Sequence, residues 1–214
     1  MIYDHTTDAY RRRWAALGDE RFNGAYYYSC EIVKNIIPRV KTERDWVTIN
    51  TNGDASDGSI VFIHNNLYPF IYDWLKPFKD LILVCGVPET CGKVKHLGTP
   101  IYLPLSIDVQ YVQTYRTEKD KGTAFAGRPS KGRNLPNNID RLEGLPRHEL
   151  LLQMARYERI YAVGRTAIEA KALGCEILPY DPRFPDVGVW QVLDNKEAAK
   201  LLQRELDKID YITS

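Results

Sequence analysis

The sequence contains no apolar run near the ~20 residues that a membrane-spanning helix needs. Its 29 lysines and arginines face 28 aspartates and glutamates, so the formal net charge is only +1. A surface for nucleic acid or anionic membrane is usually strongly basic, and this balance therefore does not indicate either partner. The amino-terminal stretch MIYDHTTDAYRRRW also lacks the apolar segment of a secretory signal. We expect a cytoplasmic protein whose anion sites are local.

Cysteine and histidine are scarce, with four of each in 214 residues. Cys85 and Cys91 do not have the spacing of a zinc knuckle, and no pair of histidines completes a set of four ligands. We therefore expect reduced thiols, no metal site and no cofactor.

Two nucleotide-binding motifs are also missing. The sequence has no G-x-G-x-x-G. The stretch GVPETCGKV has one residue too many between Gly86 and Gly92 for a phosphate loop, and Val94 stands where a serine or threonine must bind magnesium. No Asp-x-Asp pair is present to hold a metal and a diphosphate. These absences argue against a nucleotide hydrolase and against a metal-dependent sugar transferase.

What is present is an alternation of strand and helix patterns on each side of the polar segment 117–122. The fold class that this alternation predicts is α/β, with two Rossmann-like lobes, mainly parallel sheets and a ligand cleft between the lobes. The predicted lobes are 1–116 and 117–214. The predicted strands are 45–50, 59–66, 80–86, 99–105, 123–127, 159–163 and 175–180, and the clearest predicted helices are 24–40, 88–98, 146–158, 166–174 and 195–211.

The stretch GRTAIEA contains the first candidate site, comprising Gly164, Arg165, Thr166 and Glu169. One interpretation is structural: Thr166 and Glu169 have the spacing of a capping box at a helix start. The other is functional and compatible with the first. A helix N-terminus binds anions, Arg165 adds a bidentate phosphate donor, and Glu169 is able to accept hydrogen bonds from a ribose diol.

The second candidate site is the stretch FAGRPSKGR, in which Gly127 follows a predicted buried strand. Arg128, Lys131 and Arg133 lie in the loop after it. Glycine allows the backbone to approach a ligand closely, and the cations suit a diphosphate. The alternative interpretation is a solvated basic loop.

From Asp108 to Tyr180 the sequence resembles the carboxyl-terminal lobe of GT-B-fold glycosyltransferases. The matching stretches are LPLSIDVQYV, AFAGRPSKG and GRTAIEAKALGCEIL. The resemblance implies that Gly127, Arg128 and Glu169 hold the diphosphate and ribose of a nucleotide-sugar. A second glutamate that is frequent in the family, eight positions earlier, is replaced here by Tyr161.

His64 is the candidate catalytic residue of the amino-terminal lobe, because it ends the predicted strand SIVFIH. A neutral imidazole at that edge suits a general base, and a hydrogen-bonded structural histidine is the alternative. The sequence thus predicts a metal-independent glycosyltransferase that moves a sugar from a nucleotide-sugar to an acceptor. The alternative is a non-catalytic protein that binds a nucleotide or a nucleotide-derived signal in the same cleft.

Overall fold

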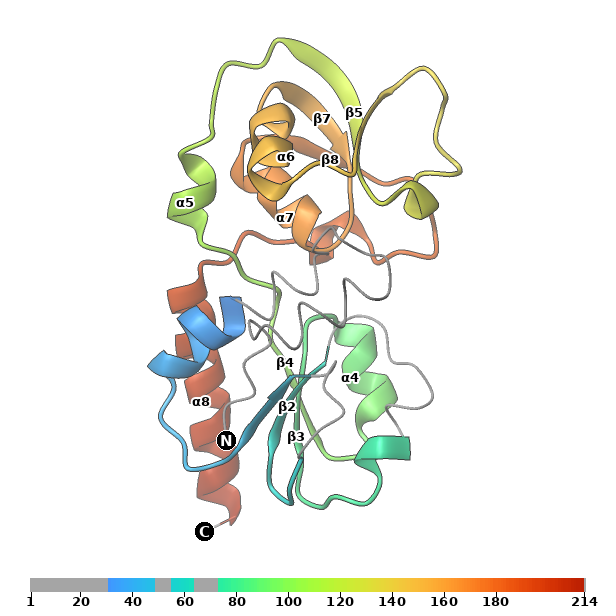
Figure 1. Cartoon of the computed structure of the whole chain (residues 1–214). Coiled ribbons are helices and arrows are strands. Elements are labelled where there is room, and N and C mark those ends of the chain that lie inside the picture. Colours follow the sequence, from blue (N-terminus) through green and yellow to red (C-terminus); the bar gives the residue numbers. More distant parts are fainter. Residues whose placement is uncertain (1–30, 49–54, 64–72, 214) are drawn as a thin grey trace. The chain divides into compact units, whose positions relative to one another are not determined.

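The computed structural model describes residues 31–48, 55–63 and 73–213 (Figure 1). Contacts divide the chain into two compact units. Unit 1 is the chain up to Pro104 together with the segment from Asn195, and unit 2 is Leu105–Asp194. This division differs from the predicted boundary between 116 and 117 in two ways. The segment 105–116 falls in unit 2, and the carboxyl-terminal helix falls in unit 1.

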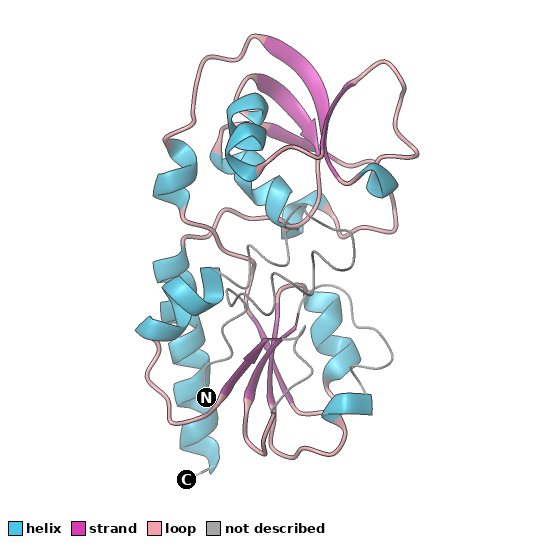
Figure 2. Ribbon diagram, in the orientation of Figure 1, coloured by secondary structure: helices cyan, strands magenta, loops and turns pink. Residues whose placement is uncertain are grey.

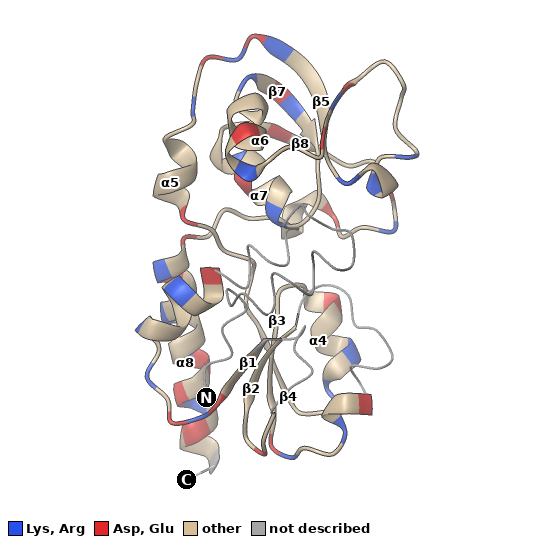
Figure 3. Cartoon of the chain, in the orientation of Figure 1, with Lys and Arg blue, Asp and Glu red and all other residues tan. Residues whose placement is uncertain are grey.

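Unit 1 contains a parallel sheet in the order β1-β2-β3-β4. Its strands are β1 (Trp46–Thr48), β2 (Ile60–Ile63), β3 (Ile82–Cys85) and β4 (Thr99–Tyr102). All residues of β2 and β3 are buried, as expected of strands covered on both faces. None of the four strands carries a charged residue, and Figure 3 draws them all in tan. The predicted strands 45–50, 59–66, 80–86 and 99–105 are therefore confirmed over the residues that the structure describes.

Helices lie on both sides of the unit 1 sheet. On one side, Val94 of α4 (Pro88–Val94) joins a buried cluster with Val61 and Leu83. On the other side lie η1 (Ile32–Ile36), η2 (Ile37–Arg39) and α8 (Asn195–Thr213), which pack on one another (Figure 1). The buried carboxylate of Glu31 accepts hydrogen bonds from Asn35 (2.8 Å) and from Asn195 at the start of α8 (2.6 Å). These bonds connect α8 to unit 1.

Unit 2 contains a second parallel sheet, in the order β6-β5-β7-β8. Its strands are β5 (Lys121–Gly127), β6 (Asp140–Glu143), β7 (Tyr157–Tyr161) and β8 (Glu176–Leu178). The helices are α5 (Val109–Gln113), α6 (Arg147–Met154) and α7 (Arg165–Ala172), with short turns η3 (Pro129–Lys131) and η4 (Val187–Val189). The sequence did not predict β6, whose residues DRLE are mostly polar.

The two faces of the unit 2 sheet are covered differently. Ala124, Ala126 and Ile160 are buried and alternate along their strands with Phe125 and Tyr161. Helices α6 and α7 pack on each other and on the sheet. Phe125 and Tyr161 are partners in register and so share one face. The β5–β6 connection is loop except for η3 (Figure 2). Its Gly132 packs closely against the ring of Phe125.

The polar segment 117–122 has a structural use. Lys119 Nζ donates to the carbonyl oxygens of Ala155 (2.8 Å) and Leu173 (3.0 Å), at the carboxyl ends of α6 and α7. Arg116 Nε donates to Ala172 O (2.8 Å). Cations at helix carboxyl ends satisfy the terminal carbonyls and suit the helix dipole.

The fold class is therefore α/β with two four-stranded parallel sheets, compatible with a Rossmann-like fold. Among the described helices, none combines the length and the apolar character needed to cross a bilayer.

Candidate functional site

The strand order of unit 2 brings both predicted binding stretches to one place. After β5 the chain forms β6 on one side of β5, and then returns to form β7 on the other side. In parallel sheets, ligands bind at the carboxyl edge where the strand order reverses in this way. Gly127 ends β5, and Gly164 follows β7 by three residues. The two stretches therefore flank the reversal point of the sheet.

The loop after β5 carries the predicted cations. Arg128 is exposed, and Lys131 is half-buried with its Nζ 5.6 Å from the centre of the Phe184 ring. Burial lowers the pKa of Lys131, and the charge of Arg128 lowers it further. The desolvated ammonium thus lies in an environment that would favour an anionic partner.

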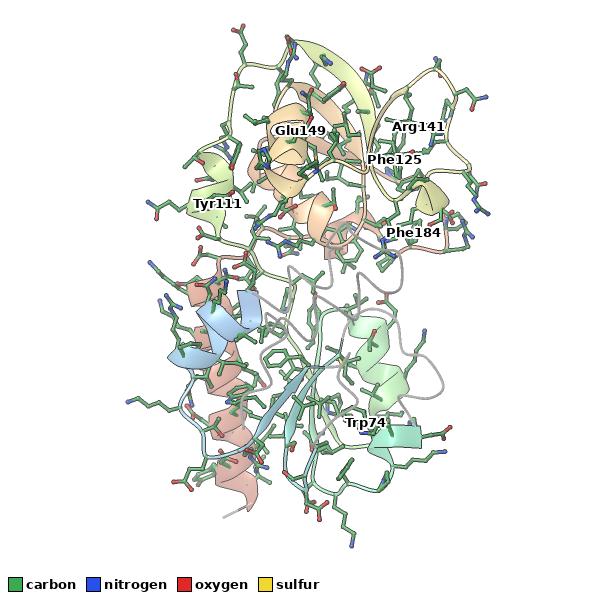
Figure 4. The ribbon with its side chains drawn as sticks, in the orientation of Figure 1. Trp74, Tyr111, Phe125, Arg141, Glu149 and Phe184 are labelled. Atoms are coloured by element: carbon green, nitrogen blue, oxygen red, sulfur yellow. The ribbon has the colours of Figure 1, made fainter. Side chains whose placement is uncertain are left out.

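Close packing against Phe125 explains the glycines of this loop. A Cβ on Gly132 would lie 2.7 Å from an atom of the Phe125 ring, and one on Gly127 would lie 3.0 Å from it. Arg141 donates to Gly132 O (3.1 Å), and its guanidinium lies 5.8 Å from the centre of the same ring. Figure 4 shows Phe125, Arg141 and Phe184 on the same side of unit 2.

The start of α7 differs from the predicted capping box. Gly164, not Thr166, is the N-cap residue, and no side-chain hydrogen bond caps this helix. Gly164 has φ 63° and ψ −139°, a backbone conformation that a residue with a Cβ reaches only with strain. Because the glycine starts the helix earlier, Thr166 lies within its first turn. The capping-box interpretation of Thr166 and Glu169 is therefore wrong.

Glu169 lies instead between two arginines. Its Oε1 accepts a hydrogen bond from Arg165 Nε (2.9 Å) and another from Arg147 Nε (3.1 Å), with Arg147 Nη2 at 3.0 Å. The side chains of Arg165 and Glu169 are each 4% exposed. Arg165 and Arg147 are the first residues of α7 and α6, so one carboxylate joins the starts of both helices.

The predicted roles of Arg165 and Glu169 in phosphate and ribose binding stay predictions. His64, the predicted base, lies outside the described residues; its position directly follows the last residue of β2.

A cavity of about 550 Å³ adjoins the start of α7. Among the residues described, its walls come from Ala162 and Val163 after β7, from Leu178 at the end of β8, and from 179–182, 184–187 and Trp190 after β8. The volume lies in the usual range for small-molecule sites, about 300–1,000 Å³. The cavity is thus on the same edge of the sheet as the two glycines.

An aromatic cluster forms part of the cavity wall. The ring of Tyr180 contacts those of Phe125 (6.0 Å between centres), Tyr161 (5.8 Å) and Phe184 (5.5 Å). Tyr161 therefore takes part in this aromatic cluster through its contact with Tyr180.

Sequence reasoning missed the residues that build this cavity wall. Tyr180 had a signal, because it is the last residue of the predicted strand 175–180 and lies two residues beyond the end of β8 at the ligand edge. Phe184 and Trp190 lie in a proline-rich loop without periodicity, and Arg147 is 22 positions from Glu169. No local pattern reveals such contacts.

The part of the chain that the structure describes contains no group of three or more side chains suited to a metal ion. Comparison of this chain with family models, with curated proteins and with solved structures gave no match.

Proposed function

We propose that this chain is a metal-independent glycosyltransferase of the GT-B type, which binds a nucleotide-sugar at the carboxyl edge of unit 2. The observation that supports this proposal is the strand reversal between β5 and β7. The stretch that starts at Gly127 and the stretch that starts at Gly164 both lie next to it. That is where open parallel sheets hold their ligands.

The chemistry of the proposed reaction needs a site for a departing diphosphate. The acceptor oxygen forms a bond to the anomeric carbon of the sugar as the bond from that carbon to the diphosphate breaks. Arg128 and Lys131 neutralise the charge that the diphosphate gains, together with the amides in the first turn of α7. His64 accepts the proton of the acceptor hydroxyl in this proposal.

A second candidate function, nucleotide binding without catalysis, is favoured by the contacts of Glu169. Its Oε1 accepts hydrogen bonds from both Arg147 and Arg165, so a ribose diol has to compete with two cations for that oxygen. In this candidate function Glu169 does not bind the ribose. The nucleotide is held instead by the loop after β5 and by the cavity.

A binding and turnover experiment tests the proposal. The protein is titrated with nucleoside diphosphates by calorimetry and incubated with the corresponding nucleotide-sugars, and release of the diphosphate is measured. Arg128→Ala should weaken diphosphate binding by about 1.5–3 kcal/mol, the usual contribution of hydrogen bonds to charged groups.

Arg133→Ala is the matched control, because it removes the same charge from the same exposed loop further from the strand end. Its affinity should stay close to that of the wild type. If Arg128→Ala and Arg133→Ala lose diphosphate affinity equally, the loop attracts anions only through its general positive charge. Diphosphate binding without release of diphosphate from any nucleotide-sugar would favour the second candidate function.

A further inference from the structure

Unit 1 contains two cysteine side chains that contact each other. Cys85 is the last residue of β3, and Cys91 lies in α4, which packs on β3. The two thiols share a side-chain hydrogen bond, and neither is part of a disulfide in the structure. Contact between the two sulfur-bearing side chains is the first requirement for a disulfide.

The surroundings of the two thiols differ. Cys85 is 0% exposed in an apolar cluster with Val61 and Leu83, and its S–H donates to Leu83 O (3.5 Å). Cys91 packs against the same cluster but is partly exposed. The neighbouring Gly92 is exposed, and a Cβ there would meet no atom within 4 Å. A small oxidant in the solvent therefore reaches Cys91 before it reaches Cys85.

The ionisation of the two thiols differs in the same sense. Burial raises the pKa of Cys85, and the charge of Cys91 and the hydrogen bond between the thiols raise it further. Burial also raises the pKa of Cys91, but the hydrogen bond from Cys85 acts in the opposite direction and lowers it. Cys91 is thus the thiol that ionises first, and the thiolate is the form that attacks an oxidant.

We propose that Cys85 and Cys91 form a reversible disulfide when the protein meets a peroxide, so that the end of β3 becomes covalently bonded to α4. The thiolate sulfur of Cys91 attacks one oxygen of hydrogen peroxide, the O–O bond breaks, and hydroxide leaves the new sulfenic acid. The sulfur of Cys85 then bonds to that of Cys91, the S–O bond breaks, and the departing hydroxide takes the thiol proton of Cys85 to form water.

The electrons and protons of these steps balance. The two thiols together lose two electrons and two protons, and the peroxide is reduced to two molecules of water. A dithiol reverses the reaction by thiol–disulfide exchange, in which both cysteines regain their protons and the dithiol is oxidised to a disulfide.

The disulfide would close a short loop at the carboxyl edge of the unit 1 sheet. Cys85 is in register with Ile63, the last residue of β2, and the segment between the two cysteines leads from β3 into α4. Loops at this edge of an open parallel sheet are the ones that form ligand sites. The proposal therefore gives that edge a restraint that depends on oxidation, and it does not rest on the function proposed for unit 2.

The test treats the full chain with hydrogen peroxide, alkylates the remaining thiols and maps the cysteines by mass spectrometry. Trypsin releases both cysteines in one peptide, 80–93, which contains no other cysteine. This peptide should lose two hydrogen atoms and lose alkylation at both cysteines. Cleavage after Glu89 by a glutamate-specific protease should leave the two halves joined, and dithiothreitol should separate them.

Single variants test the role of each thiol. Cys85→Ser should stop at the sulfenic acid of Cys91, which dimedone labels, and Cys91→Ser should leave Cys85 as a thiol. Cys85→Ala gives the same measurement if the serine variant does not fold, and thermal melting establishes which variants are folded. Cys175→Ser is the matched control, because Cys175 is a buried thiol of unit 2, and its loss should leave the disulfide in peptide 80–93 unchanged.

Three results would overturn the inference. The first is peptide 80–93 without the disulfide after peroxide treatment, and the second is a disulfide that joins Cys91 to a different cysteine. The third is a disulfide that forms only after the chain is unfolded in urea, because the native contact between the thiols would then play no part.

Discussion

At the scale of single residues, Glu169 is a buried carboxylate of unit 2 that pairs with two arginines. Its carboxylate balances Arg147 and Arg165 in a region from which water is largely excluded. Removing one partner of a buried ion pair leaves an uncompensated charge, which is far more costly than losing a surface pair.

The first prediction is that Glu169→Gln lowers the free energy of unfolding by about 3 kcal/mol, as expected for a broken buried pair. Urea titration followed by circular dichroism measures this change. Glu197→Gln is the control, since Glu197 pairs with Lys200 at 58% side-chain exposure. That variant should lose about 0.5 kcal/mol or less. A similar small loss in both variants would contradict the role given to Glu169.

Asp181 makes the stability of unit 2 depend on pH. Hydrogen bonds from Arg183 lower the pKa of Asp181 to about 2, below the value of about 3.9 expected in the unfolded chain. A lowered folded-state pKa stabilises the fold above the unfolded-state pKa, and that contribution is lost as the pH falls through the folded-state value.

The second prediction is that Asp181→Asn is less stable than the wild type at pH 7, and that the gap narrows as the pH falls from about 4 towards 2. Urea midpoints of both proteins across this range measure the gap. Asp73→Asn is the control, because Asp73 pairs with Lys76 at 69% side-chain exposure. A gap that stays constant with pH would rule out the ion pair as its cause.

At the scale of elements, Lys119 connects the carboxyl ends of two helices. Its ammonium donates to Ala155 O and Leu173 O, and it also lies 3.3 Å from Cys175 Sγ. The carbonyls at the ends of two helices and the thiol of Cys175 make this side chain a fixed part of unit 2, although the surrounding segment is the most polar in the middle of the chain.

The third prediction is that Lys119→Met lowers the free energy of unfolding by about 1.5–3 kcal/mol, the range for hydrogen bonds to a charged group. Hydrogen exchange should show the loss as faster exchange at the ends of α6 and α7. Lys208→Met is the control, because Lys208 pairs with Glu205 near it on α8 and its side chain is 66% exposed. An unchanged urea midpoint of unfolding for Lys119→Met would contradict this prediction, because water would then replace the hydrogen bonds of Lys119 without a loss of stability.

The same scale shows what sequence patterns predict and what they do not. The runs that form β2 and β3 are apolar throughout, and burial on both faces leaves few alternatives to a central parallel strand. Strand β6 was missed, because only Leu142 of its four residues is buried. Gly127 at the end of β5 and Gly164 at the start of α7 were found from local sequence. The Arg147–Glu169 contact was not, because it depends on how α6 packs on α7.

At the scale of the whole molecule, α8 decides how the chain is divided. The sequence pattern of α8 predicts an amphipathic helix, but it does not indicate which of the two sheets the helix packs near. In the structure Ala198, Leu202 and Leu206 are buried, and α8 packs on η1 and η2 within unit 1. The described segments 31–48 and 195–213 thus contribute to one unit, which no composition boundary indicates.

The fourth prediction is that Leu202→Ala destabilises unit 1 by about 2–5 kcal/mol, the usual cost of truncating a buried leucine. Hydrogen exchange should show faster exchange in β2 and β3, with β5 and β7 protected as before. Leu151→Ala in α6 is the reciprocal control, because Leu151 is buried in unit 2. Faster exchange in β5 and β7 after Leu202→Ala would contradict the division into units.

The central claim is that the carboxyl edge of the unit 2 sheet binds a nucleotide. Nuclear magnetic resonance of the labelled protein, titrated with uridine diphosphate, measures this most directly through the backbone amides. The account predicts the largest shifts at 127–132 and 163–167 on either side of the strand reversal, with Asp120, Asp140 and Tyr157 at the opposite edge unchanged. No shifts at millimolar nucleotide, or shifts centred on that opposite edge, would contradict it.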